Sequence, residues 1–302
     1  FSQRNIGYVY ANIFNFNWDL SKVPAGKAFS DEYFNAIQNL FNDSNLGTAS
    51  GLIISENTNE QDSYKAGNVL HAAFFSIDMP IMKKINFYGG IRYEDNLQTL
   101  HTYSETIGDS VNIKNRGKDL FPSFAITYNM YKDLKIKLSY GKSINRPEFR
   151  EISPYSFYDF EENATVQGNI MLKNSYINNF DLRLENYLSS NEMMSIGFFY
   201  KNFKNPIEIQ LINMGSGYNY GYHNARKAII YGFETELKIS LAKLYFIRNS
   251  SFLNKISIGG NYSRIISKLY DNYDYNVRDS IRQMQGQSPY VLNIGLWYES
   301  KN

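Results

Sequence analysis

The side chains best suited to catalysis or metal binding are few and widely separated in this sequence. Its three histidines, His71, His101 and His223, each stand alone, without a second ligand at the spacing of a metal-binding pair. We expect His71 on a strand and the other two at loop edges, with structural or solvated roles. Cysteine is absent, which excludes disulfides, thiolate metal sites and cysteine nucleophiles.

Other patterns that could do chemistry are also incomplete. Serine and aspartate are common, yet no G-x-S-x-G nucleophile motif occurs. GSGYNYG at 215–221 has glycines but no following helix or basic partner, so it does not predict a phosphate site. Asp271, Asp274 and Asp279 could offer oxygen ligands to calcium, but their spacing differs from that of an EF-hand loop. The sequence therefore predicts no catalytic residue, cofactor site or metal site.

The composition favours β-structure. The 302 residues include 26 Tyr and 21 Phe but only 7 Pro. A net charge of +2, from 31 basic and 29 acidic side chains, is too balanced to indicate a nucleic-acid partner. No run of eighteen apolar residues occurs and the mean hydropathy is -0.43, so a membrane-spanning helix is excluded. A transmembrane β-barrel is not excluded, because only every second side chain of its strands is apolar.

Alternation of apolar and polar residues marks the strands. In 134–141, Leu134, Ile136, Leu138 and Tyr140 alternate with polar residues and glycine, and a short turn joins this segment to a similar one at 119–131. Within 193–211 the alternation changes parity, and Pro206 predicts a bulge there. Ten segments are expected to be strands: 5–18, 64–79, 85–104, 119–131, 134–146, 176–188, 193–211, 226–241, 255–269 and 289–300.

The lengths of these strands and links favour a membrane protein. Most segments exceed the roughly nine to eleven residues that cross a bilayer when tilted. Short links alternate with long ones, so the long links all fall at one end of the sheet, as in outer-membrane barrels. The long links are 19–63, 105–118, 147–175, 212–225 and 270–288. The first contains a predicted helix from Ser30 to Asn42, which would pack on neighbouring loops or, alternatively, cap a pore or meet a partner.

The segment from Tyr140 to Glu185 resembles the barrel of TonB-dependent outer-membrane receptors, especially those of Bacteroidetes. A strand ends in an S-x-x-R-P-x-F turn, and a G-N-x-x-L-K element follows before the next strand. The matching residues are Ser143, Arg146, Pro147, Phe149, Gly168, Asn169, Leu172 and Lys173. Further strands similar to this family lie at 89–94, 198–208, 231–237 and 285–299, so the resemblance covers most of 63–300.

Pro147 gives this turn a physical basis. Proline cannot donate to a ladder and keeps the preceding residue extended, so pairing should stop there and the chain should enter an outer loop. The aromatic residues of that loop are expected to pack together: Phe149, Tyr155, Phe157, Tyr158 and Phe160. Their role is taken to be structural, but contact with a ligand is an alternative for Tyr155, Phe157, Tyr158, Asp159, Phe160, Glu161 and Glu162.

Charged residues on the polar side of the strands would face a wet lumen in a barrel. They would also neutralise one another across neighbouring strands. They are Arg92, Glu94, Lys135, Lys137, Asp181, Arg183, Glu185, Glu234, Glu236 and Lys238.

The resemblance implies an all-β fold, an antiparallel transmembrane β-barrel of 22 strands with a plug domain inside it and long extracellular loops. About ten strands are expected within 1–302, starting and ending on the periplasmic side. The N-terminus shows no signal sequence and the C-terminus lacks the terminal aromatic residue of a complete barrel. We therefore expect the later part of a barrel, without plug, N-terminal strands or last strands.

The function implied by this family is energy-coupled import of a scarce solute across the bacterial outer membrane, such as a siderophore, cobalamin, a glycan or a peptide. Partners would be outer-membrane lipid, the TonB complex through the absent N-terminal part, and a surface lipoprotein, with no nucleic acid and no cofactor. No enzymatic activity is expected.

Two other functions remain open. A complete ten-strand outer-membrane enzyme similar to an omptin protease would need His101 or His223 to meet an aspartate at the rim. A soluble β-sandwich that binds carbohydrate would bury the apolar face of each strand against a second sheet.

Overall fold

A computed structural model describes residues 8–11, 52–55, 63–104, 108–154, 156–160, 163–189, 192–212, 219–244, 252–271 and 280–298. The chain divides into two compact units, Phe1–Ala66 with Leu100–Asn112, and Gly67–Thr99 with Ile113–Asn302. In the first unit, β1 (Tyr8–Ala11) pairs antiparallel with β2 (Leu52–Ser55). No helix within these described ranges is long and apolar enough to cross a membrane.

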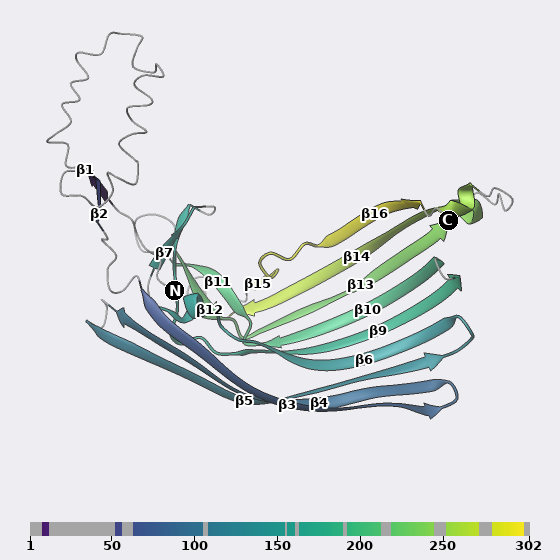
Figure 1. Ribbon diagram of the computed structural model, residues 1–302, viewed down its shortest axis with the longest axis horizontal. Coiled ribbons are helices and arrows are strands. Elements are labelled where there is room, and N and C mark those ends of the chain that lie inside the picture. The colour runs from purple at the N-terminus through teal and green to yellow at the C-terminus, as the bar shows by residue number, and fades with distance from the viewer. Residues whose placement is uncertain are drawn as a thin grey trace, which may run out of the picture. The chain divides into compact units, whose positions relative to one another are not determined.

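Most strands belong to one ten-stranded sheet (Figure 1). Its order is β15-β14-β13-β10-β9-β6-β5-β4-β3, and β16 also pairs with β14. The strands are β3 (Tyr64–Met82), β4 (Ile85–Ser104), β5 (Asp109–Asn129), β6 (Leu134–Asn145), β9 (Ser175–Ser189), β10 (Glu192–Lys204), β13 (Lys227–Ser240), β14 (Ile256–Asp271), β15 (Ser280–Arg282) and β16 (Tyr290–Tyr298). Every pairing whose register is known in this sheet is antiparallel.

The register places apolar side chains of successive strands in continuous rows on one face. Leu138 lies opposite Leu182, and Leu182 lies opposite Phe198. All three side chains are exposed, between 45% and 52%, because no second sheet covers them in the described part of the chain. Exposed large apolar rows of this extent are those of a surface that lies against lipid rather than water.

A row of aromatic rings crosses the same face. The ring centroids of Phe124 and Tyr140 are 5.5 Å apart, those of Tyr140 and Phe180 are 4.9 Å apart, and those of Phe180 and Tyr200 are 6.2 Å apart. These residues lie on β5, β6, β9 and β10 in turn. Such rows of rings flank the apolar band in outer-membrane barrels.

A separate four-stranded sheet, here called the outer sheet, is built from two of the expected long links, 147–175 and 212–225, and from the end of the expected strand 193–211. Its order is β11-β12-β8-β7, with β12 and β8 parallel and the other pairs antiparallel. Its strands are β7 (Ser156–Asp159), β8 (Ala164–Gln167), β11 (Ile207–Ile212) and β12 (Asn219–Asn224), and the short helix α2 (Phe149–Ile152) precedes β7. This outer sheet was not predicted, because its strands are short and pair across long sequence separations.

Most expected strands are present, with two corrections. The expected link 105–118 is wrong for most of its length, because β5 already begins at Asp109. The expected single strand 193–211 is two strands of different sheets, since Asn205 adopts a φ of 54° and Pro206 has no amide to donate. Pro206 therefore marks a break rather than a bulge.

Two expectations fall wholly or partly beyond the described ranges. The helix predicted at Ser30 to Asn42 lies outside them. Of the strand expected at 5–18, only β1 is described, and β1 pairs with β2 instead of joining the ten-stranded sheet. Short helical turns, α3 (Leu241–Leu244) and η4 (Leu253–Lys255), occur in the link between β13 and β14.

Candidate functional site

The turn after β6 forms as the sequence predicted. β6 ends at Asn145, and Pro147 is almost completely buried. The carbonyl oxygen of Pro147 accepts a hydrogen bond of 3.0 Å from Nε2 of Gln98 on β4. The proline therefore ends the strand, and the hydrogen bond to its carbonyl holds the start of the outer loop against β4 of the ten-stranded sheet.

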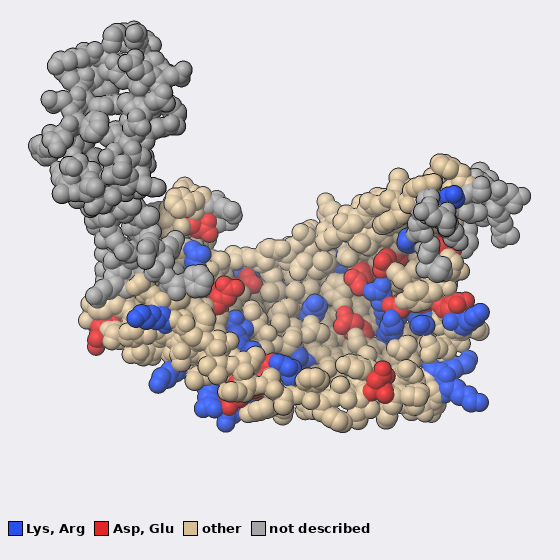
Figure 2. Space-filling model, viewed as in Figure 1, with Lys and Arg blue, Asp and Glu red and all other residues tan. Residues whose placement is uncertain are grey.

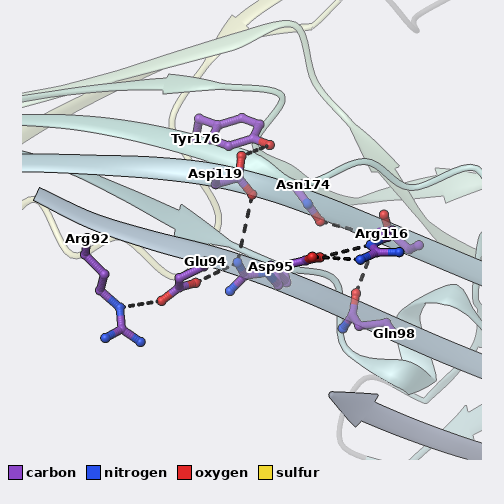
Figure 3. Close-up of polar contacts among 10 residues, drawn as sticks. Arg92, Glu94, Asp95, Gln98, Arg116, Asp119, Asn174 and Tyr176 are labelled. Carbon is purple, nitrogen blue, oxygen red and sulfur yellow. Dashed lines mark hydrogen bonds and ion pairs between the residues drawn. The ribbon is translucent and has the colours of Figure 1, made fainter. Parts of the chain in front are cut away.

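Arg146 lies at the centre of a polar cluster at this turn, in which Glu94 and Asp119 are buried. Its Nη2 donates to Oε2 of Glu94 at 2.7 Å and lies 3.9 Å from Oδ2 of Asp119. Arg92 donates to the other oxygen of Glu94 at 2.6 Å, and the Tyr176 hydroxyl donates to Asp119 at 2.8 Å (Figure 3). We call Arg92, Glu94, Asp119, Arg146 and Tyr176 the Arg146 cluster. It joins β4, β5 and β9 through the motif arginine.

Gly168 of the second motif element makes the outer loop compact. A β-carbon built on Gly168 would come within 2.8 Å of the Arg150 carbonyl oxygen and 2.9 Å of that of Glu151. The next residue, Asn169, donates its amide to the Glu151 carbonyl at 2.6 Å and its side-chain Nδ2 to the Tyr222 carbonyl at 2.9 Å. The G-N pair thus packs against α2 and binds it to β12.

Two glutamates, Glu148 and Glu151, cap the N-terminus of helix α2. Glu151 accepts a hydrogen bond of 2.9 Å from the Glu148 amide, which forms a capping box with the N-cap Glu148. Burial raises the pKa of Glu151, and the nearby Glu148 carboxylate raises it further, while the hydrogen bond from the Glu148 backbone opposes both.

The remaining motif residues tie the loop to the outer sheet. Leu172 is buried, and the carboxamide of Asn224 accepts from the Lys173 amide at 2.7 Å and donates to the Lys173 carbonyl at 2.9 Å. Asn224 also donates to the Asn205 carbonyl at 2.9 Å. Ser143 lies apart on β6, where its hydroxyl accepts from Asn179 at 3.2 Å. Asn224, the last residue of β12, was missed, because the sequence analysis placed it in the link 212–225.

The loop aromatics do not form the single cluster that was expected, because β7 directs Phe157 and Tyr158 to opposite faces. Phe157 is buried, and the Arg150 guanidinium lies 3.2 Å from its ring centroid. Tyr158 and Phe160 are 45% and 87% exposed, and they pack edge to face with centroids 5.0 Å apart. The Tyr158 hydroxyl donates to Asn163. Phe149 is half-buried at the start of α2, while Tyr155, Glu161 and Glu162 lie outside the described residues.

Charged residues cross the polar face of the ten-stranded sheet as paired groups. Arg183 contacts Glu185 at 3.1 Å, Glu236 at 2.9 Å and Glu234 at 3.9 Å, and Lys137 contacts Glu185 at 2.7 Å. These contacts neutralise charge across β6, β9, β10 and β13, and basic and acidic side chains are interspersed on the sheet in Figure 2. A cavity of about 260 Å³ lies here, lined by Arg183, Ser195, Glu234, Thr235, Glu236, Asn261 and Ser263.

The histidines lie in strands. His71 is on β3, His101 on β4 contacts Asn112 at 2.8 Å, and Nε2 of His223 on β12 lies 2.6 Å from Oδ2 of Asp271. The placement of His101 and His223 at loop edges is therefore corrected to positions near strand ends. Of the aspartates considered for calcium, Asp274 and Asp279 fall outside the described residues. Within the described ranges, no group of three or more His, Cys, Asp and Glu could hold a metal ion.

Solved structures share this fold. The siderophore receptor PiuA from Acinetobacter baumannii aligns with a TM-score of 0.56 and 14% identity, covering 78% of this chain and 32% of that one. The copper transporter OprC gives 0.56 and 14%, covering 78% and 33%. The hemophore receptor HasR of Serratia marcescens, in complex with its hemophore HasA and heme, gives 0.52 and 14%, covering 67% and 34%. The chain thus spans about a third of each, and at this identity the likeness establishes the fold alone.

No curated protein matches the sequence significantly. The family described as "TonB dependent receptor-like, beta-barrel" matches residues 1–302. The motif turn, the two-faced antiparallel sheet and this match agree, and the chain belongs to the TonB-dependent receptor-like β-barrel family.

Proposed function

We propose that residues 1–302 form wall and outer loops of a TonB-dependent transporter that imports a scarce solute across the bacterial outer membrane. The observation that carries this proposal is the family match over the whole chain, together with a sheet whose one face is apolar and exposed and whose other face carries paired charges. Such a sheet suits a wall between lipid and a wet lumen.

We infer that this wall is part of a larger barrel, namely its C-terminal part in a receptor of the Bacteroidetes type with a separate plug domain. Within the described strands, the sheet ends at β3 on one side and at β15 and β16 on the other, each with an unpaired edge. An unpaired edge in hydrocarbon costs several kcal/mol for each unsatisfied group. The structures with the same fold are about three times as long as the part this chain covers, which also supports the inference.

Solute contact is assigned to the exposed part of the outer loop. Tyr158 and Phe160 present an exposed aromatic pair, and Asp159 lies between them in sequence. Phe157 is left out because its ring is buried. Aromatic pairs supply large contact areas at low conformational cost. Tyr155 stays a candidate on sequence grounds alone.

Several classes of solute are compatible with this scaffold. The solved neighbours are named as a siderophore receptor, a copper transporter and a hemophore receptor. Siderophores, heme, metal complexes, cobalamin, glycans and peptides are therefore all candidates. The proposed partners are outer-membrane lipid, the TonB complex and a surface lipoprotein. The family and these neighbours are receptors and transporters, so we propose no enzymatic activity.

Uptake by whole cells tests the proposal. The complete protein would be expressed in a strain without its own receptors and offered labelled ferric siderophore, heme, cobalamin, oligosaccharide and peptide. We expect one of these to accumulate, and accumulation to be lost when TonB is deleted or the proton gradient is collapsed. Uptake that persists without TonB would contradict energy coupling. A matched variant with Tyr158→Ala and Phe160→Ala should reduce binding at the cell surface while leaving the amount of folded protein unchanged.

A further inference from the structure

Four lysines lie on the apolar face of the ten-stranded sheet, just beyond its row of aromatic rings. Residues directly opposite one another across the strands form a register line, and the ring row is such a line, from Tyr140 through Phe180 and Tyr200 to Tyr231. The next line towards the outer loops holds Lys142, Asn178, Asn202, Ile229 and Lys268. The line after that holds Ile144, Tyr176, Lys204, Lys227 and Tyr270. We call Lys142, Lys204, Lys227 and Lys268 the lysine belt.

The lysine belt carries positive charge without carboxylates in its own register lines. Side chains two residues apart on a strand point to the same face, so the belt shares the face of the rings. The two lines contain four lysines and no aspartate or glutamate. Lys204 and Lys268 are exposed, and Lys142 and Lys227 are half-buried. Exposed Arg264, opposite Phe233 on the same face, adds to the positive charge, although its Nη1 also donates to the Pro289 carbonyl at 3.1 Å.

Two lysines of the belt oppose each other directly. Lys204 on β10 and Lys227 on β13 are register partners, and like charges in that relation destabilise a sheet. Within the described residues, none of the four belt lysines forms an ion pair. Tyr176, the other partner of Lys204, donates its hydroxyl to Asp119, but that carboxylate belongs to the Arg146 cluster. The Lys204–Lys227 pair is therefore placed where an external anion would relieve repulsion.

Charge on the polar face of the same strands is arranged differently. There, Lys137 contacts Glu185 at 2.7 Å and Arg183 contacts Glu236 at 2.9 Å. The chain thus supplies its own counter-charges on the face assigned to the lumen. On the face assigned to lipid, the described strands supply basic residues and leave the negative partner to the surroundings.

The position of the belt matches the headgroup layer of a bilayer. Aromatic rows mark the boundary of the apolar band, and two residues advance a strand by about 7 Å. The belt therefore begins about 7 Å beyond the rings along each strand, a height that strand tilt reduces. The headgroup layer is about 5–8 Å thick on each side of the hydrocarbon. Lysine reaches into this layer because its flexible apolar stem can lie along the sheet while its ammonium group meets a phosphate.

We propose that the lysine belt binds phosphate groups of lipid headgroups in the outer leaflet of the outer membrane. The phosphates supply the counter-charge that Lys204 and Lys227 lack, and the apolar rows below the rings hold the acyl chains of the same lipid. This inference rests on the proposed function, because that function places the apolar face against lipid and the outer loops outside the cell. It adds a specific lipid chemistry and the residues that recognise it.

Lipid binding by the complete protein in detergent tests the belt. Lipid A with its phosphates and dephosphorylated lipid A are compared by native mass spectrometry. We expect the phosphorylated form to bind more tightly and to dissociate as salt is raised, because ions screen exposed charges. Lys204→Gln combined with Lys227→Gln should weaken its binding about 25-fold, since each lysine beside anionic lipid contributes roughly fivefold. Lys201→Gln is the matched control, because Lys201 lies on the polar face of the same strand, opposite Asn179.

Three results would overturn the belt. Equal binding of the two forms of lipid A would show that phosphate is not recognised. Complete displacement of lipid A by inorganic phosphate would assign the lysines to a free anion. A loss of binding in K201Q as large as in the double variant would remove the distinction between the faces.

Urea unfolding in vesicles of phosphatidylcholine, which carries no net charge, separates the remaining possibilities. The double variant should be at least as stable as the wild type there, because the repulsion between Lys204 and Lys227 is gone. Lower stability would mean that the lysines pair with a carboxylate of this chain outside the described ranges, and it would overturn the proposal. Failure of the wild type to insert into these vesicles would contradict the lipid-facing assignment and with it the proposed function. Insertion without discrimination between the two forms of lipid A overturns the belt alone.

Discussion

Gly168 packs directly against the carbonyl oxygen of Ser153, closer than any side chain would allow. A β-carbon at this position would collide with that oxygen and would also approach the carbonyls of Arg150 and Glu151 at 2.8 and 2.9 Å. All three oxygens belong to α2 or the residue after it, so the obstacle is backbone and cannot rotate away. The glycine of the G-N-x-x-L-K element is therefore explained by a close approach of two backbone segments.

Gly168→Ala should loosen the outer loop. The backbone must shift to admit the methyl group, and overpacking of this kind costs about 1–3 kcal/mol. We expect faster protease cleavage within 147–175 in outer-membrane vesicles, with the wall itself intact. Gly141→Ala is the matched control, since its β-carbon would have Ser123 Cβ at 3.9 Å as its nearest neighbour. Equal protection of both variants would contradict the packing argument.

Arg146→Met should destabilise the wall at the end of β6. The change leaves the Glu94 and Asp119 carboxylates, whose side chains are 10% and 9% exposed, without the guanidinium between them. Removal of one partner from a buried ion pair costs about 3–5 kcal/mol, and we expect the lower end of this range because Arg92 still contacts Glu94. Urea unfolding of the complete protein in lipid vesicles measures this loss, and Arg146→Lys should recover part of it.

Arg116→Met provides the comparison for Arg146. Arg116 also makes a two-pronged contact, at 3.0 and 2.7 Å to Asp95, but its side chain is 59% exposed. Water and salt screen this pair, so its loss should change the unfolding midpoint much less. A loss as large as that of Arg146→Met would show that burial is not what distinguishes the two arginines.

Local patterns predicted the wall well and the outer sheet poorly. Alternation in 134–146 and 176–188 fixed both the strands and their exposed face, because a period of two is imposed by the pleat itself. By contrast, β12 pairs with β8 across more than fifty residues, and each strand has six residues or fewer. Such short strands carry little periodic signal, and their pairing joins segments that are far apart in the sequence.

Pro147 allowed the position of the motif turn to be predicted from the sequence. The residues that contact Arg146 could not be predicted. Glu94 and Asp119 were separated from it by dozens of residues, and only the register of β4 and β5 brings them together. The contact between His223 and Asp271 could not be predicted either, because the two residues are far apart in the sequence and belong to different sheets. The expectation that lumen charges pair across strands was easier, since Arg183 and Glu185 alternate along β9, and Glu234 and Glu236 alternate along β13, which lies beyond β10 in the sheet.

The outer loop should lose stability as pH rises through the mildly acidic range. Burial raises the pKa of Glu151, so the folded loop holds the proton more tightly than the unfolded loop, whose glutamate has an ordinary pKa of about 4.3. Stability is then greatest below that ordinary value and falls until the folded pKa is passed. Protease cleavage of the loop should quicken over this interval. Glu151→Gln keeps an acceptor for the Glu148 amide but should remove the pH slope, and a slope that survives in E151Q would assign it to another group.

Adjacent residues on β6 test which face of the sheet meets lipid. Leu138 lies in the apolar row between Ile126 and Leu182, whereas Ser139 points to the other face and lies opposite Asp181. Leu138→Arg should cost about 2–4 kcal/mol if it sits near the bilayer midplane, because a guanidinium is then placed in hydrocarbon. Ser139→Arg should cost far less, since the new charge enters a wet lumen beside a carboxylate. Urea unfolding of the complete protein in vesicles measures both values. Similar losses for the two variants would contradict the assignment of one face to lipid and the other to the lumen. A larger loss for S139R would exchange the two faces and reverse the orientation of the sheet.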